Sequence, residues 1–161
     1  MEEKEKKNIG TLRDEKIKEI EELRQLQIDP FGSRFDNKQN IDLIQDRFKS
    51  IQTGEQTQET VVIAGRIKGM RRHGKAAFAD LEDRTGKLQV YIKSNQIGQE
   101  SFEIFKKISV GDIVGIKGPV FKTRTGELTV LANRFNLLSK SIRNLPEKWH
   151  GLTDIEIRYR K

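Results

Sequence analysis

Residues 76–93 read AAFADLEDRTGKLQVYIK, and this stretch decides the fold. Two runs with a period of two, 76–82 and 88–93, flank a polar break that contains Gly86. Successive side chains of a strand point to opposite faces, and glycine suits a tight turn. The stretch therefore predicts a β-hairpin with one apolar and one polar face.

The same alternation continues on both sides of this hairpin. Three further strands are predicted over residues 60–68, 111–120 and 127–133. Between the third and fourth strands, residues 98–108 place three large apolar side chains on one stripe of a short helix. Five strands with a helix in this position form the element order of the OB-fold β-barrel, a mainly β fold whose open face and loops bind oligonucleotides. A β-sandwich would usually have more strands and no helix there.

Two helices are predicted before the barrel. Thr11 and Asp14 form a capping box at the start of the first, which runs to about Gln27, and Asn40 is the expected N-cap of the second, which runs to about Gln52. The sequence thus divides into a disordered N-terminus (1–10), an N-terminal helical segment (11–58), an OB-fold domain (59–140) and a connector (141–161).

The composition favours a polyanionic partner. Lys and Arg total 31 against 24 Asp and Glu, a formal net charge of +7, although a basic protein without such a partner has the same balance. The absence of cysteine excludes disulfides and cysteine nucleophiles, and His73 and His150 lie too far apart to predict a metal site. Because no apolar run approaches the ~20 residues of a membrane helix, we expect no membrane partner and a cytoplasmic location.

One aromatic side chain lies on the polar face of the predicted hairpin. Small and aliphatic residues at alternate positions face the core, which leaves Phe78 outside beside Asp80, and the next strand puts Gln89, Tyr91 and Lys93 outside. An exposed aromatic next to amide and hydroxyl groups is typical of proteins that stack one base and read the edge of another. Alternatively, a neighbouring segment covers Phe78 or a bulge breaks the alternation.

Two basic segments border the predicted groove. The first spans the end of the first strand and the loop into the second, with five cations and no acid: Arg66, Lys68, Arg71, Arg72 and Lys75. The second, between the fourth and fifth strands, holds Lys122 and Arg124 and ends on Glu127. We expect the cations to contact phosphates, and Glu127, whose carboxylate only accepts hydrogen bonds, to meet the N–H edge of a base. Solvated charged loops, with Glu127 paired to a nearby lysine, are the alternative.

No residue pattern in the sequence predicts catalysis. It has neither a glycine-rich phosphate-binding motif nor an arrangement of nucleophile, base and orienting group.

Several stretches together resemble the class II lysyl-tRNA synthetases of the bacterial type. They are LRQLQIDPF (23–31), VIAGR (62–66), GKAAF (74–78), GKLQVY (86–91), GDIVG (111–115), FKTRTGEL (121–128), LPEKWHGL (145–152) and RYR (158–160). The resemblance covers residues 12–161 in order. In that family this region binds the anticodon stem-loop of tRNA(Lys), and it leads into a catalytic domain that ligates lysine to tRNA with ATP and Mg and forms the homodimer.

The resemblance implies roles for four side chains. The stacking phenylalanine falls on Phe78, the base-reading glutamine on Gln89, the glutamate on Glu127 and the arginine on Arg71, with Arg72 as a competitor because residues 68–73 depart from the family pattern. Since the class II catalytic motifs are missing, it implies an RNA-binding fragment that has no catalytic residue or cofactor of its own. The aspartyl and asparaginyl synthetases, which share the barrel, and general single-strand-binding OB proteins are the alternatives.

Overall fold

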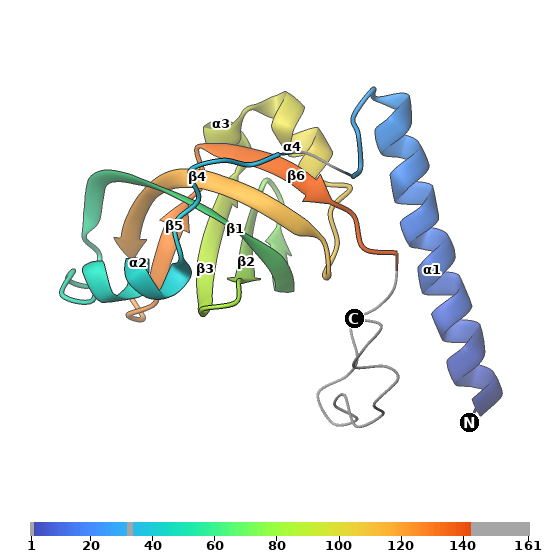
Figure 1. The fold of residues 1–161 in the computed structure, drawn as a ribbon, viewed down its shortest axis with the longest axis horizontal. Coiled ribbons are helices and arrows are strands. Elements are labelled where there is room, and N and C mark those ends of the chain that lie inside the picture. Colours follow the sequence, from blue (N-terminus) through green and yellow to red (C-terminus); the bar gives the residue numbers. More distant parts are fainter. Residues whose placement is uncertain (1, 32–33, 143–161) are drawn as a thin grey trace.

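The computed structural model describes residues 2–31 and 34–142 (Figure 1). The elements follow in the order α1 (Glu2–Gln25), α2 (Ile41–Arg47), β1 (Gln56–His73), β2 (Ala76–Glu82), β3 (Lys87–Lys93), α3 (Ser94–Ile97), α4 (Gln99–Phe105), β4 (Ile113–Lys122), β5 (Leu128–Leu131) and β6 (Arg134–Ser139). The strands wind into one curved sheet, and α1 stands beside it. Most of the predicted connector, from residue 143 onward, lies outside the described residues.

The strands close into a ring in the order β1, β2, β3, β5, β4 and back to β1. Every neighbouring pair is antiparallel except β3 and β5, which are parallel. This is the five-stranded OB-fold barrel that the sequence predicts, and the prediction is confirmed. The predicted fifth strand, 127–133, corresponds to β5, and a sixth strand that was not predicted, β6, continues along the edge of β4 that also carries β5.

The break between β5 and β6 lies opposite Gly118, where the two chain segments approach closely. A Cβ atom at Gly118 would lie 1.7 Å from the main-chain oxygen of Leu131. Only glycine leaves room for that carbonyl group. The main-chain amide of Asn133 then donates to the carbonyl oxygen of Lys117 at 2.8 Å. Gly118 therefore permits the bend between β5, which pairs with β3 and closes the barrel, and β6.

The predicted helix 98–108 corresponds to α4, which ends at Phe105, and a short helix that was not predicted, α3, precedes it. Gly98 has a φ of +90°, outside the helical range, and separates α3 from α4. Phe102 and Phe105 of α4 are buried against the barrel, and the Phe105 ring meets Phe135 of β6 edge-on with centroids 5.5 Å apart. The two helices thus cover one end of the barrel (Figure 1).

Helix α2 is shorter than predicted, and its cap comes from elsewhere in the chain. Asn40 makes no capping hydrogen bond with its side chain. Instead the amide of Ile41 donates to a carboxylate oxygen of Asp83 at 3.0 Å, and the amide of Asp42 donates to the hydroxyl of Thr85 at 3.2 Å. Burial acts to raise the pKa of Asp83, but the hydrogen bonds that it accepts from Ile41, Thr85 and Gly86 leave it below its usual value. The β2–β3 turn therefore anchors α2 to the barrel.

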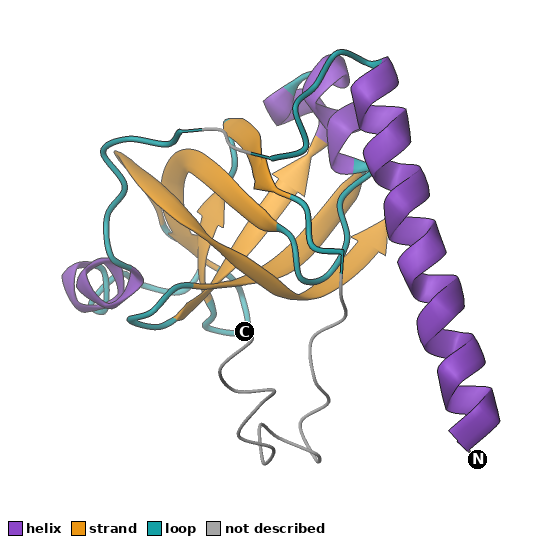
Figure 2. Cartoon of the chain, turned by 45° about the vertical axis from the view of Figure 1, so that its right-hand side comes forward, coloured by secondary structure: helices purple, strands orange, loops and turns teal. Residues whose placement is uncertain are grey.

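Helix α1 begins at Glu2 rather than at Thr11. Its early residues are mostly Glu and Lys, which are good helix formers, and no proline interrupts them. Ile20 and Leu23 are buried near its C-terminal end, while its N-terminal part extends away from the barrel (Figure 2). No helix among residues 2–31 and 34–142 combines the length and the hydropathy needed to cross a membrane.

A buried ion-pair network fixes α1 to the barrel. The Lys140 ammonium, after β6, lies 2.6 Å from a carboxylate oxygen of Asp112 and 2.5 Å from one of Glu19 on α1. The side chains of Lys140 and Asp112 are both fully buried. Lys16 on α1 donates to the carbonyl oxygen of Val110 at 3.2 Å, and burial lowers its pKa. Charges removed from water in this way stabilise the fold only while each keeps its partner.

Candidate nucleic-acid interface

The adjacent residues Arg71 and Arg72 project from opposite faces of β1. A bulge between Ile67 and Gly69 shifts the register of β1 against β2. Beyond this bulge Arg71 is opposite Phe78, and Arg72 is opposite the buried Ala77. Because directly opposed residues share a face of the sheet, Arg71 lies on the outer face with Phe78, whereas Arg72 lies on the core side.

Arg72 is held by the end of the helix that covers the barrel. Its guanidinium donates to the carbonyl oxygens of Ile108 at 2.6 Å and Phe105 at 3.4 Å, and it lies over the Phe105 ring, 4.9 Å from the centroid. Burial lowers the pKa of Arg72, while the carboxylate of Glu19 acts in the opposite direction. The geometry therefore favours Arg71 over Arg72 as the arginine of the Phe78 face.

Phe78 lies between an arginine and a tyrosine on the outer face. Its ring stacks on Tyr91 of β3, with centroids 4.4 Å apart and an interplanar angle of 15°. On the β1 side the Arg71 guanidinium lies 5.7 Å from the Phe78 centroid. Tyr91 in turn meets Phe121 of β4 edge-on at 6.3 Å, and the Lys93 ammonium lies 5.2 Å from the Tyr91 centroid. We call Arg71, Phe78, Tyr91 and Phe121 the aromatic row.

Gln89 joins this row to the start of β5. Its amide oxygen accepts a hydrogen bond from Arg71 at 3.4 Å, and its amide nitrogen donates to the hydroxyl of Thr129 at 3.0 Å. The Thr129 hydroxyl donates to the main-chain oxygen of Glu127 at 3.2 Å. The side chain of Glu127 is exposed beside this chain of contacts, whereas Gln89 is only 8% exposed. The outer face thus combines stacked aromatic rings with amide, hydroxyl and guanidinium groups, which are the groups that bind bases.

Residues 61–138, which span β1 to β6, match the family model for tRNA anticodon domains, described as an OB-fold nucleic acid binding domain. The chain is also 44% identical over 146 residues to the lysine-tRNA ligase of Carboxydothermus hydrogenoformans, and 49% identical over 142 residues to that of Pelotomaculum thermopropionicum. These alignments cover 91% and 88% of this chain. The chain belongs to the lysine-tRNA ligase family. The resemblance identified from the sequence is therefore confirmed.

The chain matches only part of each relative. It spans 29% of the Carboxydothermus ligase and 27% of the Pelotomaculum ligase. The lysine-tRNA ligase of Streptococcus suis, 48% identical over 136 residues, is likewise matched over 27% of its length, with 83% of this chain aligned. The region in common is the anticodon-binding OB domain of these ligases.

Of the four residues that the family pattern singles out, the structure brings three into direct contact. Arg71 meets both Phe78 and Gln89. Glu127 is joined to Gln89 only through its main-chain oxygen and Thr129. That these side chains bind a base stays a prediction.

The other predicted cations are divided among several surroundings. Residues 66–73 all belong to β1, and only Gly74 and Lys75 form the turn, so the first basic segment is mainly strand and not loop. Arg66 donates to the carbonyl oxygen of Gly111 at 3.1 Å, and Lys122 to that of Ile51 at 3.1 Å. Apart from Arg71 and Arg72, which are also exposed, three of the predicted cations have exposed side chains: Lys68, Lys75 and Arg124. These three are the better candidates in this OB-fold domain for contacts with phosphate.

Three residues of this face were not among the predicted site residues. Alternation along β3 placed Tyr91 on the outer face, so the sequence carried a signal for it. Phe121 lies past the predicted end of its strand, and Thr129 gains its role from pairing with Gln89 across the parallel β3–β5 contact. No local pattern in the sequence indicated that either residue belongs to this face.

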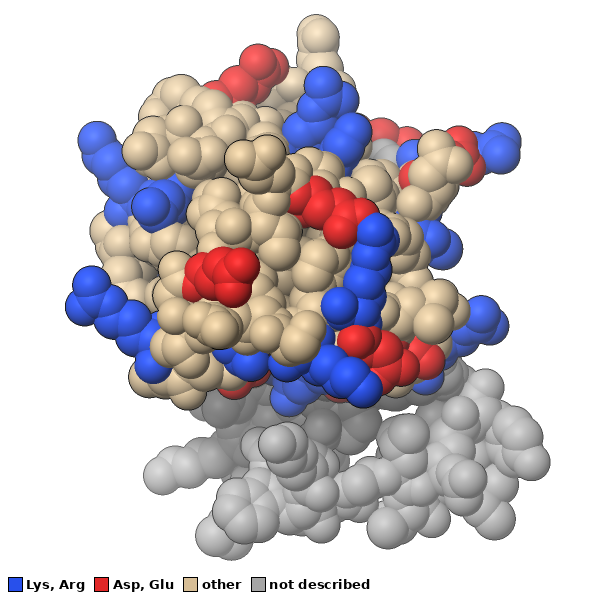
Figure 3. Space-filling view, turned by 90° about the vertical axis from the view of Figure 1, so that its left-hand side faces the viewer, with Lys and Arg blue, Asp and Glu red and all other residues tan. Residues whose placement is uncertain are grey.

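Figure 3 shows the end of the OB-fold domain that faces away from α1. Lys and Arg side chains lie around its border, and its largely uncharged centre carries a few acidic groups. Among the described residues no group of three or more His, Cys, Asp or Glu is placed to hold a metal ion.

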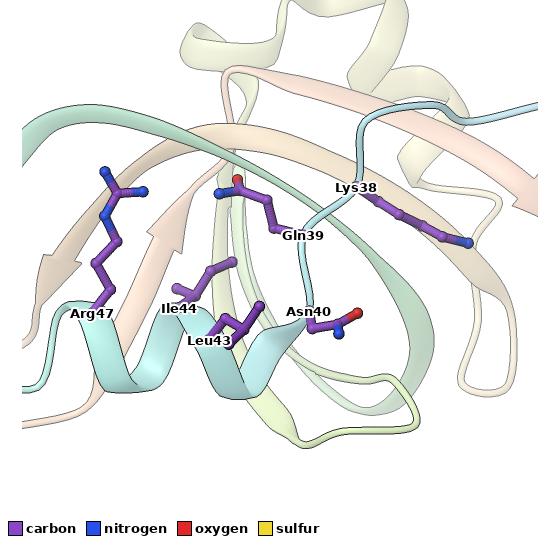
Figure 4. A pocket seen from close by; sticks show the side chains of 6 residues that line it. All are labelled: Lys38, Gln39, Asn40, Leu43, Ile44 and Arg47. Carbon is purple, nitrogen blue, oxygen red and sulfur yellow. The ribbon is translucent and has the colours of Figure 1, made fainter.

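A hollow of about 430 Å³ lies beside α2, and no residue of the aromatic row is among those that line it (Figure 4). It is lined by Lys38, Gln39, Asn40, Leu43, Ile44 and Arg47. The main-chain amide of Gln39 donates to the carbonyl oxygen of Val62, and the side-chain oxygen of Gln39 accepts from the main-chain amide of Val62. Arg47 forms an ion pair with Glu59. The polar groups here serve mainly to join the segment before α2, and α2 itself, to β1.

Proposed function

We propose that this chain binds the anticodon loop of tRNA(Lys) on the outer face of its barrel, as the N-terminal part of a lysyl-tRNA synthetase. The observation that carries the proposal is the contact of Arg71 with both Phe78 and Gln89, in a chain that belongs to the lysine-tRNA ligase family. This arrangement of Arg71, Phe78 and Gln89 combines a stacking surface with groups that form hydrogen bonds to a base.

In this proposal a base reaches the Phe78 ring from the β1 side. Tyr91 already covers the other face of the ring, at 4.4 Å, whereas the Arg71 guanidinium is 5.7 Å from the centroid and its side chain is exposed. The base displaces the guanidinium and stacks on Phe78, which Tyr91 supports from behind. Arg71 is then free to donate to a base carbonyl or to a phosphate.

The polar groups favour uridine over cytidine as the middle anticodon base, as the UUU and CUU anticodons of lysine require. Uridine presents one N–H donor between two carbonyl acceptors. The amide oxygen of Gln89 or the carboxylate of Glu127 accepts from the N–H, and Arg71 or the Gln89 amide nitrogen donates to a carbonyl. Cytidine reverses the pattern at two positions, which leaves at least one buried polar group unpaired at a cost of ~1–3 kcal/mol.

The exposed cations around this face contact phosphates. Lys68 lies at the bulge of β1, Lys75 in the β1–β2 turn and Arg124 in the β4–β5 turn. Contacts of this kind strengthen binding to all RNA sequences about equally and make it dependent on salt. They position the anticodon loop, while the base-reading groups provide its specificity.

In this proposal lysine is activated by the part of the ligases that this chain does not match. We infer that ligation of lysine to tRNA, with ATP and Mg, and homodimer formation belong to the catalytic domain that follows in the relatives, and that this chain alone binds RNA without catalysis. With this chain, lysine, ATP and labelled pyrophosphate we expect no exchange above a protein-free control. Exchange above that control would contradict this part of the proposal.

Replacement of Phe78 tests the stacking surface. We expect Phe78→Ala to weaken binding of a UUU anticodon stem-loop by ~1–3 kcal/mol, the usual value of one base–aromatic stack, as measured by fluorescence anisotropy. Phe31→Ala is the matched control, because Phe31 is also half-buried but pairs with Ser139 of β6. An unchanged affinity for Phe78→Ala would contradict the proposal. An equal loss on a scrambled loop would instead favour a general single-strand binder.

A further inference from the structure

We propose that Thr129 is a positioning residue that fixes the side-chain amide of Gln89 in one orientation and so sets its selectivity for the base. This inference rests on the proposed function. Gln89 and Thr129 are opposite each other in the parallel pair of β3 and β5, and the amide nitrogen of Gln89 lies 3.0 Å from the Thr129 hydroxyl oxygen. Thr129 is fully buried, and it acts through Gln89 without itself touching a base.

The orientation of the amide follows from counting protons. A threonine hydroxyl has one proton, and Thr129 donates it to the main-chain oxygen of Glu127 at 3.2 Å. Toward Gln89 the hydroxyl therefore only accepts, and the amide nitrogen must face it. Arg71 has donors and no acceptor, so the amide oxygen must face Arg71. Both neighbours impose the same orientation.

A fixed amide distinguishes bases that a free amide does not. A glutamine amide that can turn by 180° exchanges its donor and its acceptor, and so pairs equally well with uridine and cytidine. Turning Gln89 would place its oxygen against the lone pairs of Thr129 and its nitrogen against the guanidinium of Arg71. Both hydrogen bonds would be lost inside a residue that is only 8% exposed. The remaining N–H and lone pair of the amide are therefore presented to the base in one arrangement.

When Arg71 moves to admit a base, Thr129 becomes the more important of the two restraints. Arg71 is exposed and its hydrogen bond to Gln89 is long, at 3.4 Å. Thr129 is held on both sides, by Gln89 and by the main-chain oxygen of Glu127, and lies within the strand that closes the barrel. The orientation of Gln89 in the RNA complex thus depends on the hydroxyl of Thr129.

The test compares Thr129→Val, which keeps the shape and removes the hydroxyl, with Thr129→Ser, which keeps the hydroxyl. Each variant is titrated with two stem-loops whose anticodons are UUU and UCU. We expect the ratio of the two affinities to fall about fivefold in Thr129→Val, about 1 kcal/mol for one hydrogen bond, and to stay within twofold of wild type in Thr129→Ser. A merely structural loss would weaken both loops equally and leave the ratio unchanged.

A measurement on the wild-type chain without RNA keeps the test independent of how the valine variant folds. In ¹⁵N spectra the side-chain amide of Gln89 is identified by its loss in Gln89→Leu, and we expect the amide proton that it donates to Thr129 to exchange slowly with water. Fast exchange overturns the positioning role. An unchanged ratio in Thr129→Val, with the wild-type preference for UUU intact, overturns the positioning role alone. A wild type without that preference overturns the proposed base reading itself.

Discussion

The different surroundings of Arg71 and Arg72 lead to a prediction in which two adjacent substitutions have opposite effects. Arg72→Ala removes two hydrogen bonds, to the carbonyl oxygens of Ile108 and Phe105 at 2.6 and 3.4 Å, and the contact with the Phe105 ring at 4.9 Å. Arg71→Ala removes one long hydrogen bond, at 3.4 Å, and a contact with the Phe78 ring at 5.7 Å. We therefore expect Arg72→Ala to lower the stability and Arg71→Ala to weaken RNA binding.

The size of the stability loss follows from these contacts. A hydrogen bond from a charged donor contributes ~1.5–3 kcal/mol, but the second bond of Arg72 is long and water can reach the freed carbonyl groups. We expect Arg72→Ala to lower the free energy of unfolding by ~1–2 kcal/mol, which for a chain of this size lowers the Tm by about 3–6 °C. Arg71→Ala should change it by less than ~0.5 kcal/mol, as for most surface substitutions.

Two assays separate the effects of the two arginines. Thermal unfolding measures stability, and fluorescence anisotropy with a UUU stem-loop, at a temperature where both variants are folded, measures binding. We expect Arg71→Ala to weaken binding by ~1–3 kcal/mol and folded Arg72→Ala to bind within about threefold of wild type. A weaker affinity with an unchanged Tm for Arg72→Ala would refute the assignment of faces that follows from the bulge in β1.

Three further predictions concern the fold. Asp83→Ala should lower the free energy of unfolding, measured with denaturant, by ~1 kcal/mol through loss of the α2 cap. Because the pKa of Asp83 is lowered in the folded chain, the difference from wild type should be full at neutral pH and should shrink as the pH falls below about 4. Gly118→Ala should prevent cooperative thermal unfolding, since its Cβ would lie 1.7 Å from the Leu131 oxygen; a Tm within 5 °C, roughly 2 kcal/mol, of wild type would contradict this. Lys140→Ala should cost ~3–5 kcal/mol in denaturant unfolding because it leaves Asp112 buried without its cation, and a loss below about 1 kcal/mol would show that the network contributes little.

The fold was predictable where its pattern is local. Strand β2 has the predicted bounds, Ala76–Glu82, because its alternation of buried and half-buried residues is unbroken. The cap of α2 was not predictable, since the acceptor for Ile41 is Asp83, 42 residues further along the chain. Nor was the short helix α3 predictable, because its four residues, Ser94–Ile97, are too few to show a helical period.

Which side chains of the candidate site lie on the outer face was predictable in part, for the same reason. Alternation along β2 and β3 identified Phe78 and Gln89, which need only local regularity. The choice between Arg71 and Arg72 depends on the bulge after Ile67. Unbroken alternation from the buried Ile67 would have put Arg72 outside and Arg71 inside, and the extra residue reverses this. A bulge is defined by the partner strand, so the sequence of β1 alone does not show it.

The central claim is that the outer face of the barrel reads the middle base of a lysine anticodon. The most direct measurement is a titration of the wild-type chain with two anticodon stem-loops that differ only at that base, UUU and UCU. The account predicts that cytidine weakens binding by ~1–3 kcal/mol, about 5- to 100-fold, because one buried polar group is left unpaired. Affinities within twofold of each other would contradict it.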